Sequence, residues 1–220
     1  MNIWNDTEAQ HFFSSERKKK NDLYLGERFF LSKALFENCS ILDIGCAQGG
    51  FYKILKSFLK SFSYTGIDNS EKMIIRAKKK YPKANFYFLK NNNFKLLKKK
   101  YDIVIIFGVL HLTPEWRRIL SNSRNLFKKF LLFDLRETNL KTIENNVSKS
   151  FLSFNHKKKT KIPYNIINSS EATKFIKKKF ISNIYKLSYH GKISSLAKSK
   201  IKDVEFTNYC ISKKNLNFYD

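Results

Sequence analysis

Residues 40–55 read SILDIGCAQGGFYKIL and contain three of the seven glycines in the chain, Gly45, Gly49 and Gly50. An apolar run ends at Ile44, and apolar residues at helical spacing resume from Phe51. Glycine lets a backbone turn sharply and lie against a ligand, because it has no Cβ. A glycine-rich turn between a buried strand and a helix therefore predicts a small-molecule site at the carboxyl edge of a parallel sheet.

Strand-like and helix-like segments alternate on both sides of this turn. The apolar runs predict strands over 40–45, 63–68, 85–90, 101–108 and 130–135. Helical spacing predicts helices over 22–36, 51–62, 70–81, 114–129 and 169–179, with Ser70 and Thr113 as N-caps. Two further strands, 181–191 and 204–214, could close the sheet as an antiparallel pair. The order predicts an α/β fold with a mostly parallel sheet and helices on both faces.

The composition leaves two readings of the charge open. The formal net charge is +25, which favours nucleic acid or an anionic surface as a partner. The excess is mostly lysine, in runs dispersed along the chain, as A+T-rich coding would also produce. Those runs are Lys18–Lys20, Lys78–Lys80, Lys98–Lys100, Lys157–Lys159 and Lys177–Lys179.

Three cysteines form neither a disulfide framework nor a metal-ligand spacing, so we expect a reducing compartment and no metal. The first twenty residues lack the apolar core of a signal peptide, and no apolar run approaches the length of a membrane span. We therefore expect a cytoplasmic protein.

Two aspartates narrow the choice of ligand. The stretch reads D-x-G-x-x-x-G-G and not the dinucleotide fingerprint G-x-G-x-x-G. A carboxylate at Asp43 would repel a pyrophosphate but would suit a ligand with a cationic amine. Asp68, at the end of the second predicted strand, is placed to accept hydrogen bonds from both ribose hydroxyls. A ribose and an ammonium group on one ligand indicate S-adenosylmethionine.

Residues 40–135 resemble the core of the class I S-adenosylmethionine-dependent methyltransferases. The matching segments are ILDIGCAQGGF, YTGIDNSEKMI, NFYFLKNNN, YDIVIIFGVLHLTPEW and LFKKFLLFDL. The resemblance implies a Rossmann-like sheet of seven strands with a reversed final strand. The sequence shows no Gly/Ser-rich linker, so we expect a single domain over 1–220, with a helical N-terminal extension (1–39), a cofactor-binding core (40–135) and a lid or insertion with closing strands (136–220).

The resemblance assigns cofactor-binding residues by position. Asp43, Gly45 and Gly49 would line the methionine end, with Cys46 beside them, and Asp68 would hold the ribose. Asn69 and Met73 would flank the adenine, Asn91 or Asn92 would contact its amino group, and Phe107 and Gly108 would lie under the cofactor. The chain departs from the family's pattern at Ala47, where glycine is common, and at the Asn run, where an aspartate is usual.

The acceptor side is less determined by the sequence. His111 could act as a general base for a hydroxyl acceptor or could only pack. Arg136 could hold an acidic or sugar acceptor or could pair with Glu137, and Tyr164 and His190 are further substrate candidates. Trp116 could line an acceptor pocket or pack on its helix.

The segment IIFGVLHLTPEW lacks the fourth-strand aspartate of ribosomal RNA 2′-O-methyltransferases and the Pro-Pro-aromatic motif of base N-methyltransferases. The C-terminal part is similar to bacterial methyltransferases linked to surface carbohydrates. We expect methyl transfer to a small-molecule or saccharide acceptor, by O-methylation. The alternatives are an RNA methyltransferase that uses the basic surface and a cofactor-binding protein without catalysis.

Overall fold

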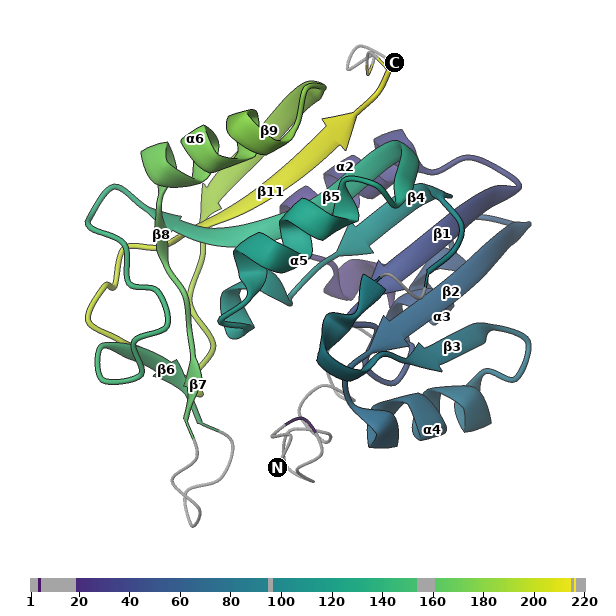
Figure 1. The fold of residues 1–220 in the computed structure, drawn as a ribbon, viewed down its shortest axis with the longest axis horizontal. Coiled ribbons are helices and arrows are strands. Elements are labelled where there is room, and N and C mark those ends of the chain that lie inside the picture. Colours follow the sequence, from purple (N-terminus) through teal and green to yellow (C-terminus); the bar gives the residue numbers. More distant parts are fainter. Residues whose placement is uncertain (1–3, 5–18, 95–96, 154–160, 215, 217–220) are drawn as a thin grey trace.

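The computed structural model describes residue 4 and residues 19–94, 97–153, 161–214 and 216 (Figure 1). Within these residues, seven strands form the main sheet in the order β3-β2-β1-β4-β5-β11-β9, and β8 pairs with β5 off this path. Their bounds are β1 Cys39–Ile44, β2 Phe62–Asp68, β3 Asn85–Phe88, β4 Tyr101–Ile106, β5 Phe127–Thr138, β8 Ile167–Asn168, β9 Asn183–His190 and β11 Glu205–Ser212.

The direction of the strands confirms the predicted fold. β1 to β5 pair in parallel, whereas β11 runs antiparallel to both β5 and β9. The two C-terminal strands therefore close the sheet, and β11 is the reversed final strand that the sequence led us to expect. Parallel strands bring their carboxyl ends to one edge, which is where a ligand site is expected.

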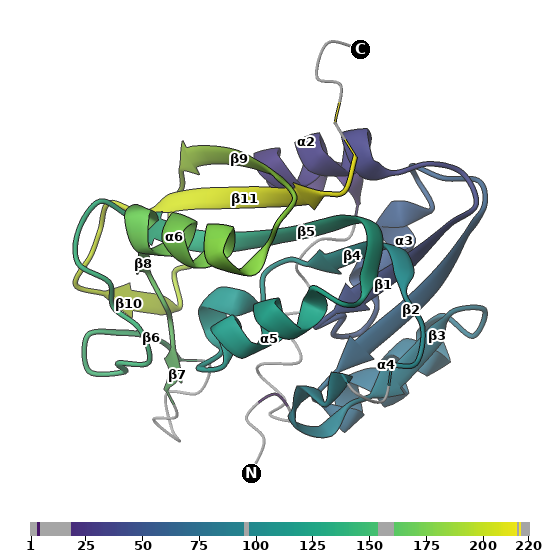
Figure 2. The same ribbon diagram turned by 45° about the horizontal axis from the view of Figure 1, so that its top comes forward.

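Helices cover both faces of the sheet (Figures 1 and 2). Apolar residues of three helices pack in one cluster on the first face, and those of two others pack on the second. The first face carries α2 (Leu25–Ala34), α3 (Gly50–Leu55) and α4 (Glu71–Lys80), and the second carries α5 (Trp116–Ser123) and α6 (Ser169–Lys179). Alternation along the buried strands supplies both faces with apolar side chains.

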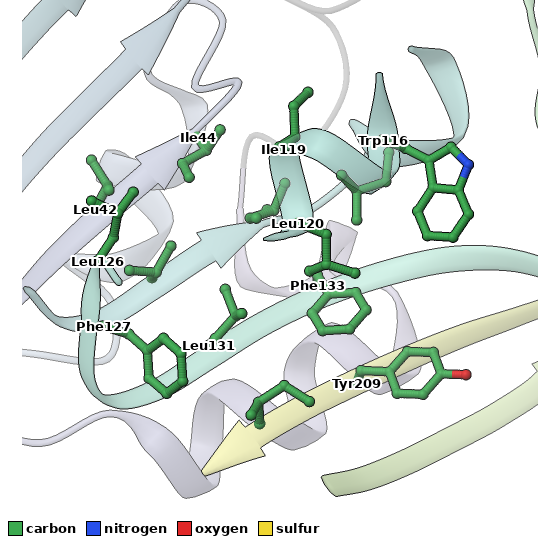
Figure 3. Close-up of a cluster of buried hydrophobic side chains, with 14 of the residues drawn as sticks. Leu42, Ile44, Trp116, Ile119, Leu120, Leu126, Phe127, Leu131, Phe133 and Tyr209 are labelled. Carbon is green, nitrogen blue, oxygen red and sulfur yellow. The ribbon is translucent and has the colours of Figure 1, made fainter. Parts of the chain in front are cut away.

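The core under α5 and α6 is rich in aromatic residues (Figure 3). The rings of Phe133 on β5 and Tyr209 on β11 stack with centroids 4.9 Å apart, and Trp116 is fully buried against Phe175. Trp116 Nε1 donates a hydrogen bond of 2.8 Å to Glu144, so this tryptophan is anchored in the core. Burial of this apolar surface is the main stabilising contribution on this face.

Two predicted helices are shorter than expected. α3 ends at Leu55, because i→i+3 bonds from Ser57 and Phe58 tighten the chain before Phe62 pairs with Cys39 in the sheet. The helix predicted over 114–129 ends at Ser123, since β5 already begins at Phe127. Its N-cap is Glu115 rather than Thr113, although Thr113 Oγ1 accepts a hydrogen bond from the Glu115 amide.

The other caps follow the sequence more closely. Ser70 caps α4, where its hydroxyl accepts a hydrogen bond from the Met73 amide. The Asn168 side chain caps α6 by accepting from the amides of Ser170 and Glu171. Both helices therefore begin where Ser or Asn satisfies the first amide donors.

The segment after β5 builds a second, smaller sheet where the sequence shows little periodicity. Strands β6 (Ser150–Leu152), β7 (Ile162–Pro163) and β10 (Ala197–Ser199) form it in the order β10-β6-β7. Its apolar cluster includes Leu112, which follows β4, and Phe206 of β11. The small sheet therefore packs beside the carboxyl edge of the main sheet.

Cys39, Cys46 and Cys210 are buried free thiols. Across the described parts of the chain, no three His, Cys, Asp or Glu residues gather as a metal site would require. In the same parts, no helix combines the length and apolarity that a membrane crossing needs.

Candidate functional site

The turn after β1 takes the strained shape that its glycines predict. Gly45 and Gly49 have φ angles of +78° and +79°, in the left-handed region that favours glycine. The Gly45 amide donates to the Ile67 carbonyl of β2 at 2.8 Å. A Cβ on Gly45 would lie 2.4 Å from Cγ2 of Val109, so this glycine allows the turns after β1 and β4 to touch.

Asp68 joins this turn to the end of β2. Its Oδ2 accepts a hydrogen bond from the Ala47 amide at 2.9 Å, and its Oδ1 accepts from the Ser70 amide at 2.8 Å. Ala47 itself has a φ of +46°, which explains why glycine is common at this position in the family that the sequence resembles. The two bonds fix the carboxylate and hold Ala47 in its strained conformation.

Burial raises the pKa of Asp68 to about 6, and the hydrogen bonds from the amides of Ser70, Ala47 and Asn69 oppose this rise. The carboxylate is therefore ionised above neutral pH and close to titration in mildly acidic solution. A carboxylate with backbone donors on both oxygens can still accept hydrogen bonds from ligand hydroxyls, because each oxygen has two lone pairs.

A cavity lies over the carboxyl ends of β1, β2 and β4. Its lining is mostly apolar, and Asp68, Asn69 and Thr113 are its residues with polar side chains. The described residues that line it are Trp4, Ile44, Gly45, Ala47, Asp68, Asn69, Met73, Gly108, Val109, Leu112, Thr113 and Ile119. Such a cavity, apolar with a few convergent polar groups, is typical of a small-molecule site.

Five of the predicted cofactor residues meet in this lining: Gly45, Asp68, Asn69, Met73 and Gly108. They lie at the carboxyl ends of β1, β2 and β4 and near the start of α4, and the strand order brings these positions to the same edge of the sheet. Gly108 has a φ of +74° and turns the chain at the end of β4. Met73 is buried beneath the cavity in the first turns of α4.

Asp43 does not belong to the lining found among the described residues. Strand alternation places it on the face opposite that of Leu42 and Ile44, and its Oδ2 accepts a 2.5 Å hydrogen bond from the Tyr64 hydroxyl. Asp43 is 2% exposed, so its carboxylate lies under the glycine turn and joins β1 to β2.

Four other predicted residues also lie apart from the cavity lining as far as the structure describes it. Cys46 and Phe107 are buried in the core under α2 to α4, where Phe107 contacts Phe51, and Gly49 packs toward Phe86. Asn91 is exposed in the short helix η3 (Lys90–Asn92), where its carbonyl accepts a hydrogen bond from Arg118. The side chain of Asn92 falls outside the described part of the structure.

The acceptor candidates fall into two groups. Arg136 is buried and pairs with Asp134, not with Glu137, which lies on the other face with Lys186 and Tyr209. Arg136 Nε also donates to the Tyr164 hydroxyl at 3.3 Å, and the rings of Tyr164 and His111 meet edge-on at 5.1 Å. His190 stands apart, because it is exposed at the end of β9 and pairs with Asp203.

Several lining residues had no signal in the sequence. Trp4 stands in a polar N-terminal stretch, yet it lines the cavity, and its carbonyl accepts a hydrogen bond from Ser70 Oγ at 3.1 Å. Val109, Leu112 and Ile119 look like ordinary core residues in the sequence. Only the three-dimensional arrangement shows that they line this cavity.

Comparison with known proteins bears on the family of this chain. Residues 42–129 match the family described as Methyltransferase domain. Over 154 residues, or 68% of this chain, the sequence is 30% identical to "Putative methyltransferase 235L" of Invertebrate iridescent virus 6. The chain spans about half the length of that curated relative, 55%.

Solved structures share the fold. The plantazolicin methyltransferase BamL, crystallised with a triazolic desmethylPZN analog and SAH, is 19% identical with a TM-score of 0.58, over 84% of this chain and 81% of BamL. An S-adenosylmethionine-dependent methyltransferase from Clostridium acetobutylicum is 12% identical with a TM-score of 0.58, over 96% of this chain and 97% of that chain. The sequence motifs, the strand order and the family match agree, and the chain belongs to the class I S-adenosylmethionine-dependent methyltransferases.

Proposed function

We propose that the chain transfers a methyl group from S-adenosylmethionine to a small hydroxylated acceptor or a saccharide, by O-methylation. The observation that carries the cofactor assignment is Asp68, which fixes the glycine turn and faces the cavity beside Asn69 and Met73. A Cβ on Gly45 would clash with the Val109 side chain in the cavity wall, so only glycine fits at this position of the turn.

The described residues fit the parts of this cofactor. Asp68 would accept hydrogen bonds from the ribose hydroxyls, and Asn69 and Met73 would flank the adenine. Gly45, Ala47 and Gly108 would lie against the methionine portion. When bound, the cofactor supplies an electrophilic sulfonium methyl, so the protein has to align an acceptor and exclude water.

The small sheet supports an acceptor of limited size. Leu112 belongs both to the cavity lining and to the apolar cluster of the small sheet, and Trp4 packs on the same cluster. The backbone of Asn165 also donates to the His111 carbonyl at 2.7 Å, which ties the segment before β8 to the turn after β4. These contacts cover the carboxyl edge beside the cavity and favour a small molecule over an extended polymer.

The net charge of +25 favours RNA as a second candidate acceptor. The position of the described lysine runs opposes it. Two runs end helices: Lys78–Lys80 end α4, and Lys177–Lys179 end α6. The strands that follow these helices start at the amino edge of the sheet. The third run, Lys98–Lys100, directly precedes β4, which also starts at that edge. These runs therefore lie away from the cavity, and two of them suit the negative ends of helices.

The experiment that tests the proposal combines binding and transfer. Calorimetry with S-adenosylhomocysteine measures cofactor binding, and methyl-labelled cofactor is then incubated with pools of hydroxylated small molecules, saccharides and RNA. We expect label on a small hydroxylated compound, with an O-methyl signal in its NMR spectrum. Label on RNA, with binding to RNA that falls steeply with salt, would favour the second candidate. Binding without transfer to any pool would indicate a cofactor-binding protein.

The affinity for S-adenosylhomocysteine is expected to depend on pH through Asp68. Ribose hydroxyls donate to the ionised carboxylate, so binding favours loss of its proton. Affinity should be nearly constant above about pH 7 and should fall as the pH drops through the pKa of about 6, by about tenfold between pH 7 and pH 5. Calorimetry across this range checks the result, and Asp68→Asn should bind weakly with no such dependence. An equal slope in that variant would assign the titration to another group.

His111 is expected to be dispensable for the chemical step. Its side chain is 6% exposed, packs against Tyr164 and is absent from the cavity lining among the described residues. We expect His111→Gln to keep turnover within about threefold, measured with the acceptor found above, whereas loss of a general base costs about 10²-fold or more. A loss of that size, with unchanged affinity for S-adenosylhomocysteine, would make His111 the base.

A further inference from the structure

A buried ion pair on β5 reaches the wall of the cavity through one backbone amide. Arg136 donates to Asp134 Oδ2 at 2.6 Å, and the side chains are only 4% and 2% exposed. The other carboxylate oxygen, Oδ1, accepts a hydrogen bond from the Gly108 amide at 2.6 Å. Asp134 therefore links the cation on its own strand to the turn that ends β4.

The Gly108 turn needs such a support. Gly108 has a φ of +74° and, with Val109, lines the cavity, so its backbone sets the shape of one wall. β4 and β5 pair up to Ile106 and Phe133, and Gly108 lies beyond this last paired position. The hydrogen bond from the Gly108 amide to Asp134 joins β4 to β5 beyond the last paired position of the two strands. Because Asp134 is charged, this bond is stronger than a bond between neutral groups.

Arg136 is held from several sides. Its guanidinium lies 3.8 Å from the centre of the Phe206 ring, and its Nε donates to the Tyr164 hydroxyl at 3.3 Å. Burial lowers the pKa of Arg136, but Asp134 and Tyr164 together more than offset this and keep the pKa above its usual value. The arginine therefore stays charged and neutralises the buried Asp134 carboxylate.

We propose that Asp134 is a positioning residue for the cofactor because its carboxylate fixes the Gly108 turn, and that Arg136 neutralises the buried charge of this carboxylate. Arg136 then acts through Asp134 rather than by holding the acceptor. This assignment rests on the proposed function, because it takes the cavity beside Gly108 as the cofactor site.

Two double variants separate the hydrogen bond from the ion pair. D134N/R136M removes both charges but keeps a side-chain oxygen for the Gly108 amide, whereas D134A/R136M removes both charges and the acceptor. Removing both charges together avoids an unpaired buried ion. We expect D134N/R136M to bind S-adenosylhomocysteine within about threefold of wild type, and D134A/R136M to bind about tenfold more weakly or worse. Equal affinities in the two variants would overturn the assignment.

Glu137→Gln is the matched control. Glu137 is the next residue on β5, is equally buried and also pairs with a cation, but it faces Lys186 and Tyr209 on the opposite face. We expect this variant to lose stability in thermal unfolding and to keep wild-type affinity. Weakened binding that matches D134A/R136M would mean that any damage to β5 impairs the site, which would also overturn the assignment.

Hydrogen exchange at the Gly108 amide gives a readout that needs neither activity nor ligand. We expect slow exchange in wild type and D134N/R136M and fast exchange in D134A/R136M. If D134A/R136M does not fold, the exchange rate of the Gly108 amide in wild type still tests the proposal. Fast exchange in wild type would refute the hydrogen bond to Asp134. Failure of wild type to bind S-adenosylhomocysteine would overturn the proposed function, while the exchange result would still test the support of the turn.

Discussion

Asp68→Ala is expected to weaken S-adenosylhomocysteine binding about 100-fold, or about 2.7 kcal/mol, the scale of hydrogen bonds to a charged group. The variant loses the acceptor proposed for the ribose hydroxyls. It also leaves the amides of Ala47 and Ser70 without the carboxylate that they now share, at 2.9 and 2.8 Å. The Ala47 backbone, at a φ of +46°, then loses the bond that holds its left-handed conformation. Calorimetry on the folded variant measures the effect.

Asp102→Ala is the control for this change. Asp102 Oδ2 also accepts a hydrogen bond from a backbone amide of the neighbouring strand, that of Ser40 at 2.9 Å. It lies at the start of β4, so it occupies the amino edge of the sheet, away from the cavity. We expect Asp102→Ala to lower stability without changing affinity. Wild-type affinity in Asp68→Ala would remove the observation on which the cofactor assignment depends.

The sequence predicted those parts of the fold that depend on local pattern. Apolar runs such as Ile103–Phe107 mark buried parallel strands, and caps such as Ser70 mark helix starts, because both features follow from residues close in the chain. The cavity-lining residues Asp68 and Gly108 were predictable for the same reason, since both stand at the carboxyl end of a strand. The strand order then brings them to one edge.

Sequence patterns say less where the direction of a side chain or a distant contact decides the outcome. Asp43 precedes the glycine turn by two residues, but strand alternation turns its carboxylate toward Tyr64, so its place at the cofactor stays a prediction. The pairing of Arg136 with Asp134 rather than Glu137 follows the same alternation. The small sheet is built from strands of two or three residues, which are too short to show periodicity, and Trp4 reaches the cavity through a contact with Ser70 that no local pattern encodes.

Gly45→Ala is expected to weaken S-adenosylhomocysteine binding at least about 30-fold, or about 2 kcal/mol. The new Cβ would lie 2.4 Å from Cγ2 of Val109, so one of the two turns that line the cavity has to move. Alanine at a φ of +78° also carries a strain of about 1–2 kcal/mol, which lowers stability. Binding by calorimetry and thermal unfolding together report both effects.

Two further variants separate the clash from the strain. Asn38→Ala also places alanine at a positive φ, +63°, but before β1 at the amino edge, so it should lower stability without changing affinity. Gly45→Ala/Val109→Ala removes the methyl group that the new Cβ meets while the strain remains. If contact between the two turns shapes the cavity, this double variant should recover much of the lost affinity but little of the lost stability. Recovery of neither would mean that the conformation of Gly45, and not its contact with Val109, keeps the cavity open.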